Sequence, residues 1–430
     1  MRTIIRLSAF ILFLNIFPQA VFSQNISFPK PREEKLLNDL KLLIWNQQNA
    51  DKITVKLRIH SGSAFDQTDK MGTIALLSDI LFPDDGIKDF FKDELEGSLK
   101  IDYGYDYIQI TAVSKPGQLL TILETLSPAI VNPTIDKELT EKVKAKRLEL
   151  LKKLERDPNY VGEREAAKQL FGDFPYGRPI EGTTESVGKI DFADLIFAKQ
   201  RFLTSDNATM TVSGNVSSTF AYRAVRRLFG GWGKRTEKVP SMFRLPDKPN
   251  TSVVNLTLKG AEHIVSTNAA NSVARKDDAY FASNILERII AIRSAALKSA
   301  ADITASQQSY LLRGAFFLSV RSDSDAAPAE NKKDLFSAVL AEKITNSEFE
   351  SARSSLLNDF RMQDPAELWL DIDTFQLQSA GDETKRLLAV SLADVQKAAD
   401  EILAGPRTSV EIGPPKDAPV DQTKDPKDPR

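Results

Sequence analysis

Alternation of apolar and polar residues predicts strands at regular intervals along the chain. In the clearest case Ile53, Val55, Leu57 and Ile59 alternate with Thr54, Lys56 and Arg58, which is the period-two pattern of a half-buried strand. The Ser61-Gly-Ser63 turn follows it. Further strands are predicted over residues 107–113, 208–213, 253–258, 314–320 and 408–412.

Helical spacing of apolar residues predicts helices between these strands. In residues 136–156, Leu139, Val143, Leu150 and Leu154 form one stripe, and the remaining lysines and arginines indicate a solvated face. Other helices are predicted over residues 71–82, 191–201, 278–298, 347–359 and 392–403. Because mixed strands and helices occur in a similar order twice, we predict an α+β fold of two duplicated domains, each an antiparallel-rich sheet packed with helices.

The ends and the middle of the chain differ in composition from these segments. Residues 1–23 combine an early Arg2 and Arg6, a short apolar run and a small-residue exit, which predicts a signal peptide and an exported, periplasmic or secreted product without a membrane span after cleavage. The proline-punctuated segment 237–250 is interpreted as a linker between domains at 24–236 and 251–412. The proline-rich, charged tail 413–430 is predicted to be disordered.

Composition excludes several classes of chemistry. The chain has no cysteine, so thiolate ligands, cysteine nucleophiles and disulfides are impossible. A net charge of −2 with well-mixed charges makes nucleic acid an unfavourable partner. His60 and His263 are the two histidines. They are far apart in sequence, and we interpret both as structural or surface residues.

Residues 72–82, GTIALLSDILF, carry the most informative motif. Inverzincin peptidases have H-x-x-E-H on a helix, where two histidines bind zinc and the glutamate activates water. The segment resembles the longer frame G-T-A-H-F-L-E-H-M-L-F of the insulinase and mitochondrial-processing-peptidase family. In this alignment the histidine positions are Ala75 and Asp79, and the base position is Ser78. The frame itself is matched by Gly72, Thr73, Leu77, Leu81 and Phe82.

Other segments resemble the same family in the same order, across most of the chain after residue 23. They are Leu37-Asn-Asp-Leu40, His60-Ser-Gly-Ser63, Pro175-Tyr-Gly-Arg-Pro179, Gly182-Thr183 with Glu185-Ser-Val187, and 202–216. The resemblance implies a processing-peptidase-like fold. It also implies a third zinc ligand, for which Glu141 is the best match, and substrate-gripping residues near 297–306, where this chain offers Lys298 as a weak substrate-binding candidate.

The resemblance therefore implies a catalytically inactive homologue without zinc or another cofactor. The function we favour is that of a partner subunit, which closes with an H-x-x-E-H family member around a chamber for a peptide substrate. Two alternatives stay open. One is a residual metallopeptidase in which Asp79 and Glu141 hold a hard cation, and the other is a stand-alone peptide-binding scaffold.

Overall fold

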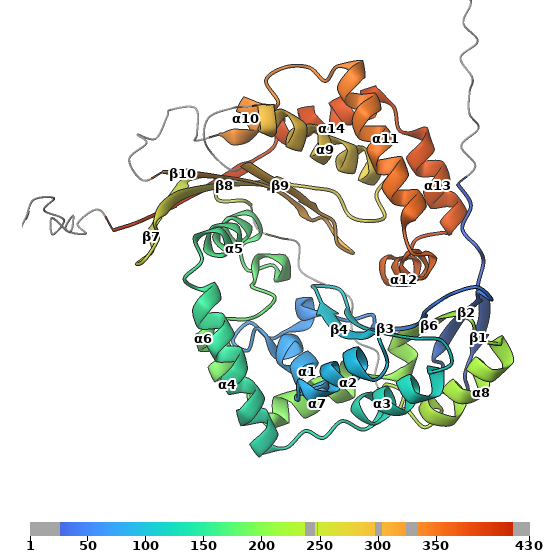
Figure 1. Ribbon diagram of the computed structural model, residues 1–430. Coiled ribbons are helices and arrows are strands. Elements are labelled where there is room, and N and C mark those ends of the chain that lie inside the picture. The colour runs from blue at the N-terminus through green and yellow to red at the C-terminus, as the bar shows by residue number, and fades with distance from the viewer. Residues whose placement is uncertain (1–25, 237–245, 247, 297–302, 324–333, 416–430) are drawn as a thin grey trace, which may run out of the picture.

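The computed structural model describes residues 26–236, 246, 248–296, 303–323 and 334–415. The predicted signal peptide, Lys298, and most of the predicted linker and tail lie outside these residues. The described chain forms two β-sheets that are covered by helices (Figure 1). Among the helices described, none is both long enough and apolar enough to cross a membrane.

The first sheet has the strand order β1-β2-β6-β3-β5-β4. Strands β2 and β6 run parallel, and the other neighbours are antiparallel. Its strands are β1 (Arg32–Lys35), β2 (Lys41–Asn46), β3 (Ile53–Ile59), β4 (Ser98–Tyr103), β5 (Ile108–Ser114) and β6 (Ala208–Gly214).

The second sheet has the order β7-β11-β8-β10-β9, in which only β7 and β11 pair in parallel among the described strands. Its strands are β7 (Val253–Thr257), β8 (His263–Asn271), β9 (Ile303–Gln308), β10 (Ala315–Asp323) and β11 (Arg407–Gly413). Without β1, each sheet has five strands. When these are numbered along the chain within each sheet, both sheets have the same spatial order: first, last, second, fourth, third. This shared topology confirms the predicted duplicated α+β fold.

Helices of the first half pack mainly on one face of the first sheet, where the apolar side chains of β3 point. The buried leucines and isoleucines of α1 and α3 complete this core. The helices are α1 (Thr73–Leu81), α2 (Gly86–Asp93), α3 (Leu119–Val131), α4 (Lys137–Leu154), α5 (Pro158–Phe171), α6 (Thr184–Gly188), α7 (Phe192–Phe202) and α8 (Ser218–Phe229), with short 3-10 turns at Ser63–Phe65, Pro175–Gly177 and Ser205–Asn207.

Apart from α12, the helices of the second half cover the far face of the second sheet (Figure 1). Phe281, Ile285 and Ile289 of α9 lie in that core together with Phe316 and Leu318 of β10. The helices are α9 (Tyr280–Ala296), α10 (Leu335–Val339), α11 (Asn346–Met362), α12 (Pro365–Phe375), α13 (Ala380–Ala389) and α14 (Leu392–Ala404).

The two halves exchange a helix. Helix α5 belongs to the first half by sequence, but its Leu170 and Phe171 share a core with Val410 and Ile412 of the second sheet. A Cβ atom at Gly162 of α5 would approach the Thr267 hydroxyl oxygen to 2.9 Å, so the helix and β8 pack closely. Conversely, α12 from the second half lies against the first sheet (Figure 1).

The α12 contact is ionic where it meets the polar face of β3. Arg58 donates to Asp371 at 2.7 Å and to Glu367 at 2.6 Å, and Lys56 lies 2.5 Å from Glu367. Gln109 of β5 also donates to Glu367, at 2.8 Å. We call these five residues the inter-half network. It buries the side of β3 that sequence alternation assigns to solvent.

His60 adds a polar contact beside this network. Its Nδ1 lies 3.0 Å from the hydroxyl of Thr374 in α12, and its Nε2 lies 3.0 Å from the hydroxyl of Thr209 in β6. The Thr209 hydroxyl also donates to Asp373. His60 therefore has a structural position between the halves, as the sequence predicts, and His263 begins β8.

Candidate functional site

Helix α1, which carries the degenerate motif, has a firmly fixed start. Gly72 precedes it with φ of 89°, and a Cβ atom there would approach the Glu181 carbonyl oxygen to 2.6 Å. The Asp66 carboxylate accepts the backbone N–H groups of Gly72 at 2.8 Å and of Ile74 at 3.1 Å. These contacts satisfy donors that an α-helix leaves unpaired at its first turn.

Two of the three motif positions are closed off from solvent. Ala75 is fully buried, and Ser78 is nearly so. The Ser78 hydroxyl donates to the carbonyl oxygen of Ile74 at 2.8 Å, one turn back along the helix. Such a back-bonded serine has its proton committed to the backbone. Ser78 is therefore poorly placed to act as a general base.

Arg147 of α4 is bound to the third motif position. Its Nε and Nη2 lie 2.8 and 2.6 Å from one carboxylate oxygen of Asp79. Nη1 donates to the Tyr103 hydroxyl at 2.6 Å, and Nη2 also donates to the Ala75 carbonyl oxygen at 3.3 Å. The Arg147 side chain is only 3% exposed. Burial lowers its pKa, but Asp79 and Tyr103 more than offset this and hold the pKa above its usual range.

A guanidinium therefore lies against both former histidine positions. Its positive charge repels a cation, and it already pairs with the Asp79 carboxylate through Oδ2. Within the described part of the chain, no group of three or more histidine, aspartate or glutamate side chains is arranged to hold a metal. The residues present do not fit zinc.

The other site candidates from the sequence do not join this cluster. Glu141 is 56% exposed and pairs with Lys144 at 2.8 Å, so α4 presents Arg147 rather than Glu141 to Asp79. Lys298 lies outside the described residues. Sequence analysis missed Arg147, although a signal existed: it lies four residues after Val143 on the buried face of α4. Leu150, which the stripe included, is instead 44% exposed.

A cavity of about 310 Å³ opens beside the Asp79–Arg147 pair. Ile101 and Tyr103 of β4 line one wall, and Leu150 and Lys146 of α4 line another. Strand β4 is an edge strand that pairs only with β5 among the described strands. Unpaired backbone groups of an edge strand can accept an added strand. The site thus keeps a hollow next to a strand edge.

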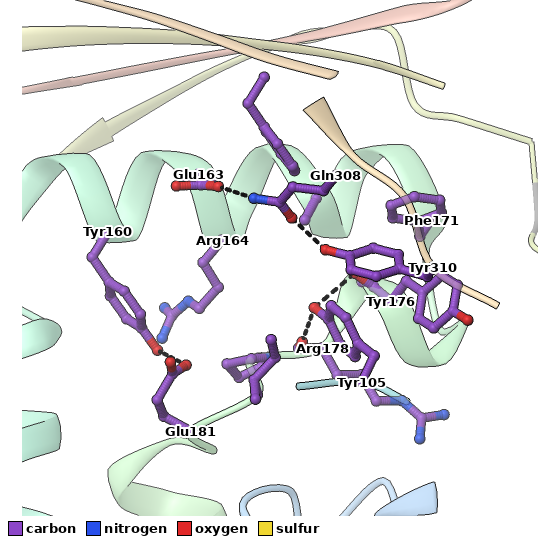
Figure 2. A pocket seen from close by; sticks show the side chains of 15 residues that line it. Tyr105, Tyr160, Glu163, Arg164, Phe171, Tyr176, Arg178, Glu181, Gln308 and Tyr310 are labelled. Atoms are coloured by element: carbon purple, nitrogen blue, oxygen red, sulfur yellow. Dashed lines mark hydrogen bonds between the residues drawn. The ribbon is translucent and has the colours of Figure 1, made fainter. Parts of the chain in front are cut away.

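A second hollow, of about 190 Å³, lies between the halves (Figure 2). In this inter-half pocket, Gln308 of β9 donates to Glu163 of α5 at 2.8 Å, and the Tyr310 hydroxyl donates to the side-chain oxygen of Gln308. The Tyr160 hydroxyl donates to Glu181 at 3.2 Å. Both halves supply side chains, so the pocket exists only when they are docked.

Aromatic rings form much of the inter-half pocket. The ring centroids of Tyr105 and Tyr176 are 5.0 Å apart, and those of Tyr176 and Tyr310 are 4.6 Å apart. Burial raises the pKa of Glu163, with the charge of Glu181 as a further cause. The lining carries two carboxylates, Glu163 and Glu181, and two guanidinium groups, Arg164 and Arg178, so its formal charges balance. The tilted tyrosine rings favour an aromatic group.

Residues 189–356 match the family model described as the peptidase M16 inactive domain. No curated protein matches the sequence. A protease from Helicobacter pylori has a TM-score of 0.81 at 15% identity, with 90% of this chain and 100% of that chain covered.

Two other solved structures share the fold. A peptidase M16 inactive domain from Pseudomonas fluorescens has a TM-score of 0.77 at 16% identity, covering 90% of this chain and 98% of its own. A chain of complex III2 from Candida albicans has a TM-score of 0.70 at 15% identity, covering 89% and 95%. These structures show that the chain has an M16-type peptidase fold of two duplicated sheets. The family model agrees with the resemblance over residues 189–356, which is less than half of the chain.

Proposed function

We propose that this chain is an exported, catalytically inactive partner subunit of a zinc-bearing insulinase-family peptidase and forms part of its peptide chamber. The observation that carries the proposal is the Arg147–Asp79 pair. The chain has the fold of these peptidases, and an ion pair between buried Arg147 and half-exposed Asp79 lies where the motif would bind a metal. One similar chain belongs to complex III2, an assembly, which favours a subunit role.

Peptide contact is proposed at two places. The cavity beside β4 offers a strand edge with Tyr103 and Leu150 at its wall, which suits an extended peptide. The inter-half pocket offers tyrosine rings between two carboxylates and two guanidinium groups, which suits an aromatic side chain. Most of helix α1 is covered by the chain itself, so only the mouth of the cavity near Asp79 is available to a peptide or a partner.

The alternatives differ in what they require. A residual metallopeptidase needs Asp79 and Glu141 to converge on a cation, whereas Asp79 is bound to Arg147 and Glu141 is paired with Lys144. A stand-alone scaffold needs no second subunit and would use the same hollows. Copurification of the chain with a second subunit therefore distinguishes the partner-subunit hypothesis from the scaffold hypothesis.

The chain should copurify from its native host with an H-x-x-E-H family member, and peptidase activity of the extract should fall when the chain is deleted. Adding back the wild-type chain should restore the activity. A variant with Leu150→Glu, which places a charge at the mouth of the cavity, should restore less. The matched control is Phe220→Glu on α8, at a similarly exposed position outside the lining of that cavity.

A monodisperse monomer in native extracts, with the relative fully active alone, would favour the scaffold. If Leu150→Glu and Phe220→Glu restored the same peptidase activity, the cavity beside β4 would have no part in the interaction with the partner.

The purified chain should contain far less than one zinc per molecule and should leave unstructured peptides uncut. The physical reason is the absence of imidazole at Ala75 and Asp79 together with the guanidinium of Arg147. Elemental analysis and a peptide-cleavage assay with and without a chelator measure both properties. One equivalent of zinc with chelator-sensitive cleavage would contradict the proposal of an inactive subunit.

A further inference from the structure

A hollow on the outer side of the second half belongs to neither of the sites described above. We call it the outer pocket, and its volume of about 390 Å³ lies in the range of small-ligand sites. Ala270 of β8 and Phe316 of β10 line it from the sheet, and Ser283 of α9 and Ile402 of α14 line it from the helices. In Figure 1 α9 and α14 cover the face of the second sheet that points away from the first half. The outer pocket is therefore separate from the inter-half pocket.

Three polar side chains in the lining of the outer pocket have no hydrogen-bond or ion-pair partner among the described residues. They are Asn271, Ser283 and Arg313. Ser283 is only 2% exposed, so its hydroxyl is largely shielded from bulk water. Buried hydroxyl groups in proteins are nearly always hydrogen-bonded. A partner for the Ser283 hydroxyl therefore has to come from what occupies the outer pocket.

Arg313 and Glu401 are the charged residues in the lining of the outer pocket. Glu401 lies 3.9 Å from Lys397, one helical turn earlier, and this lysine offsets part of its charge. The guanidinium of Arg313 is exposed and has no carboxylate at ion-pair distance in the described part of the chain. A guanidinium pairs with a carboxylate through two parallel hydrogen bonds. Arg313 is thus free to pair with a carboxylate of a ligand.

A second hollow, of about 370 Å³, continues the outer pocket along α14. The two hollows share Ala398 and Glu401 in their linings. Ala279 and Ala282 of α9 also line the second hollow, and such small side chains leave room for a close-lying backbone. A ligand that reaches from Arg313 past Ala398 has to be a chain, so this shape suits a short peptide better than a small anion.

Each residue that lines the outer pocket has described neighbours in the sequence on both sides. Residues 297–302 precede Ile303, which pairs with Val320, and residues 324–333 follow Asp323, which pairs with His263. These positions lie at the end of the second sheet opposite to Arg313, which comes just before the start of β10. The argument for the outer pocket thus rests on described residues throughout.

We propose that the outer pocket binds the carboxyl terminus of a peptide. The terminal carboxylate pairs with Arg313, and an apolar last side chain lies against Phe316 and Ile402. Asn271 and Ser283 supply hydrogen bonds to the end of the peptide backbone, and the preceding residues follow α14 into the second hollow. The inference does not depend on the proposed peptidase partner, because the outer pocket shares no lining residue with the cavity beside β4 or with the inter-half pocket.

Fluorescence anisotropy of the purified chain with a labelled peptide tests this proposal. The probe is a tetrapeptide that ends in leucine and carries fluorescein at its amino end, made once with a free carboxylate and once with a terminal amide. The chain should bind the free acid at least about tenfold more tightly, because the amide loses a charge-assisted hydrogen-bonded pair. Arg313→Met should weaken binding of the acid to the level of the amide and leave binding of the amide nearly unchanged.

Arg321→Met is the matched control for Arg313→Met. Arg321 is also exposed, also without an ion-pair partner among the described residues, and lies near the other end of β10, outside both hollows. This variant should keep the full preference for the acid. Ser283→Ala should weaken binding of the acid several-fold without lowering the melting temperature, because the lost hydroxyl has no partner in the free chain.

Three results would overturn the proposal. The first is equal affinity of the wild-type chain for the acid and the amide. The second is an acid preference that Arg313→Met leaves intact or that Arg321→Met removes equally. The third is displacement of the probe by free leucine as readily as by the unlabelled tetrapeptide, which would assign the outer pocket to a free amino acid instead of a peptide.

Discussion

Replacing Arg58 with methionine should lower the free energy of unfolding by about 3–5 kcal/mol, as expected when one partner of a buried ion pair is removed. The Arg58 side chain is only 2% exposed and donates to Asp371, Glu367 and Gln109. Methionine keeps the length of the side chain but leaves the Asp371 carboxylate without its guanidinium. Chemical denaturation followed by fluorescence measures the change.

Two further variants make the Arg58 result specific. Arg227→Met removes an arginine whose pair with Glu124 is well exposed on both sides, and it should change stability little. Adding Asp371→Asn to Arg58→Met removes the orphaned charge and should recover part of the loss. If Arg58→Met and Arg227→Met unfold at the same denaturant concentration, α12 is not held to the first sheet by the inter-half network.

Truncating Leu77 to alanine should cost about 2–5 kcal/mol, the usual range for a buried leucine. Leu77 is fully buried in the core under the first sheet, on the helix that carries the degenerate motif. Leu81 is also buried, one helical turn later, and Leu81→Ala should behave similarly. The half-exposed Leu150 on α4 is the matched control, because its truncation leaves no buried cavity. Thermal or chemical unfolding of the three variants gives the comparison.

Substitutions at the motif positions Ser78 and Asp79 should differ in how much they change the free energy of unfolding. Ser78→Ala should be nearly neutral, since the lost hydroxyl bonds only to the backbone of its own helix. Asp79→Asn should cost about 1–3 kcal/mol, because a buried guanidinium then loses its charged partner. The motif alone predicts that Asp79 faces an empty site and tolerates change. Equal stability of Leu77→Ala, Ser78→Ala and Asp79→Asn would show that α1 is not packed as described.

The spacing of apolar residues predicted many of the helices and strands, because each element buries one face and the apolar residues recur with its period. The alternation in residues 53–59 coincides with β3, and the apolar spacing in residues 392–403 matches α14 to within one residue. Some strands were missed even though their residues alternate. Strand β4 reads SLKIDY, in which polar and apolar residues alternate, but it is a short edge strand in which only Leu99 is buried. Helix α5 was missed because its buried residues pack on the sheet of the other half, and its apolar positions follow that surface.

The candidate site was also predicted only in part from the sequence. Loss of the histidines is a property of single positions, so the sequence predicts at once that Ala75 and Ser78 cannot hold or activate a metal ligand. Which residue of α4 faces them depends on the rotation of that helix. The family resemblance selects Glu141, whereas packing places Arg147 there. One-residue steps on a helix turn a side chain by about 100°, so a small misalignment exchanges a solvated residue for a buried one.

The sequence by itself determined the fold class, the duplication and the degenerate zinc motif, because periodicity and the identity of a few residues suffice for these. Only the tertiary structure decided what covers each polar surface. Lys56 and Arg58 read as the solvent face of a strand, yet α12 brings Glu367 and Asp371 from more than three hundred residues away to meet them. Contacts between such distant segments depend on how the two sheets dock. The alternation within β3 alone cannot predict that α12 packs against it.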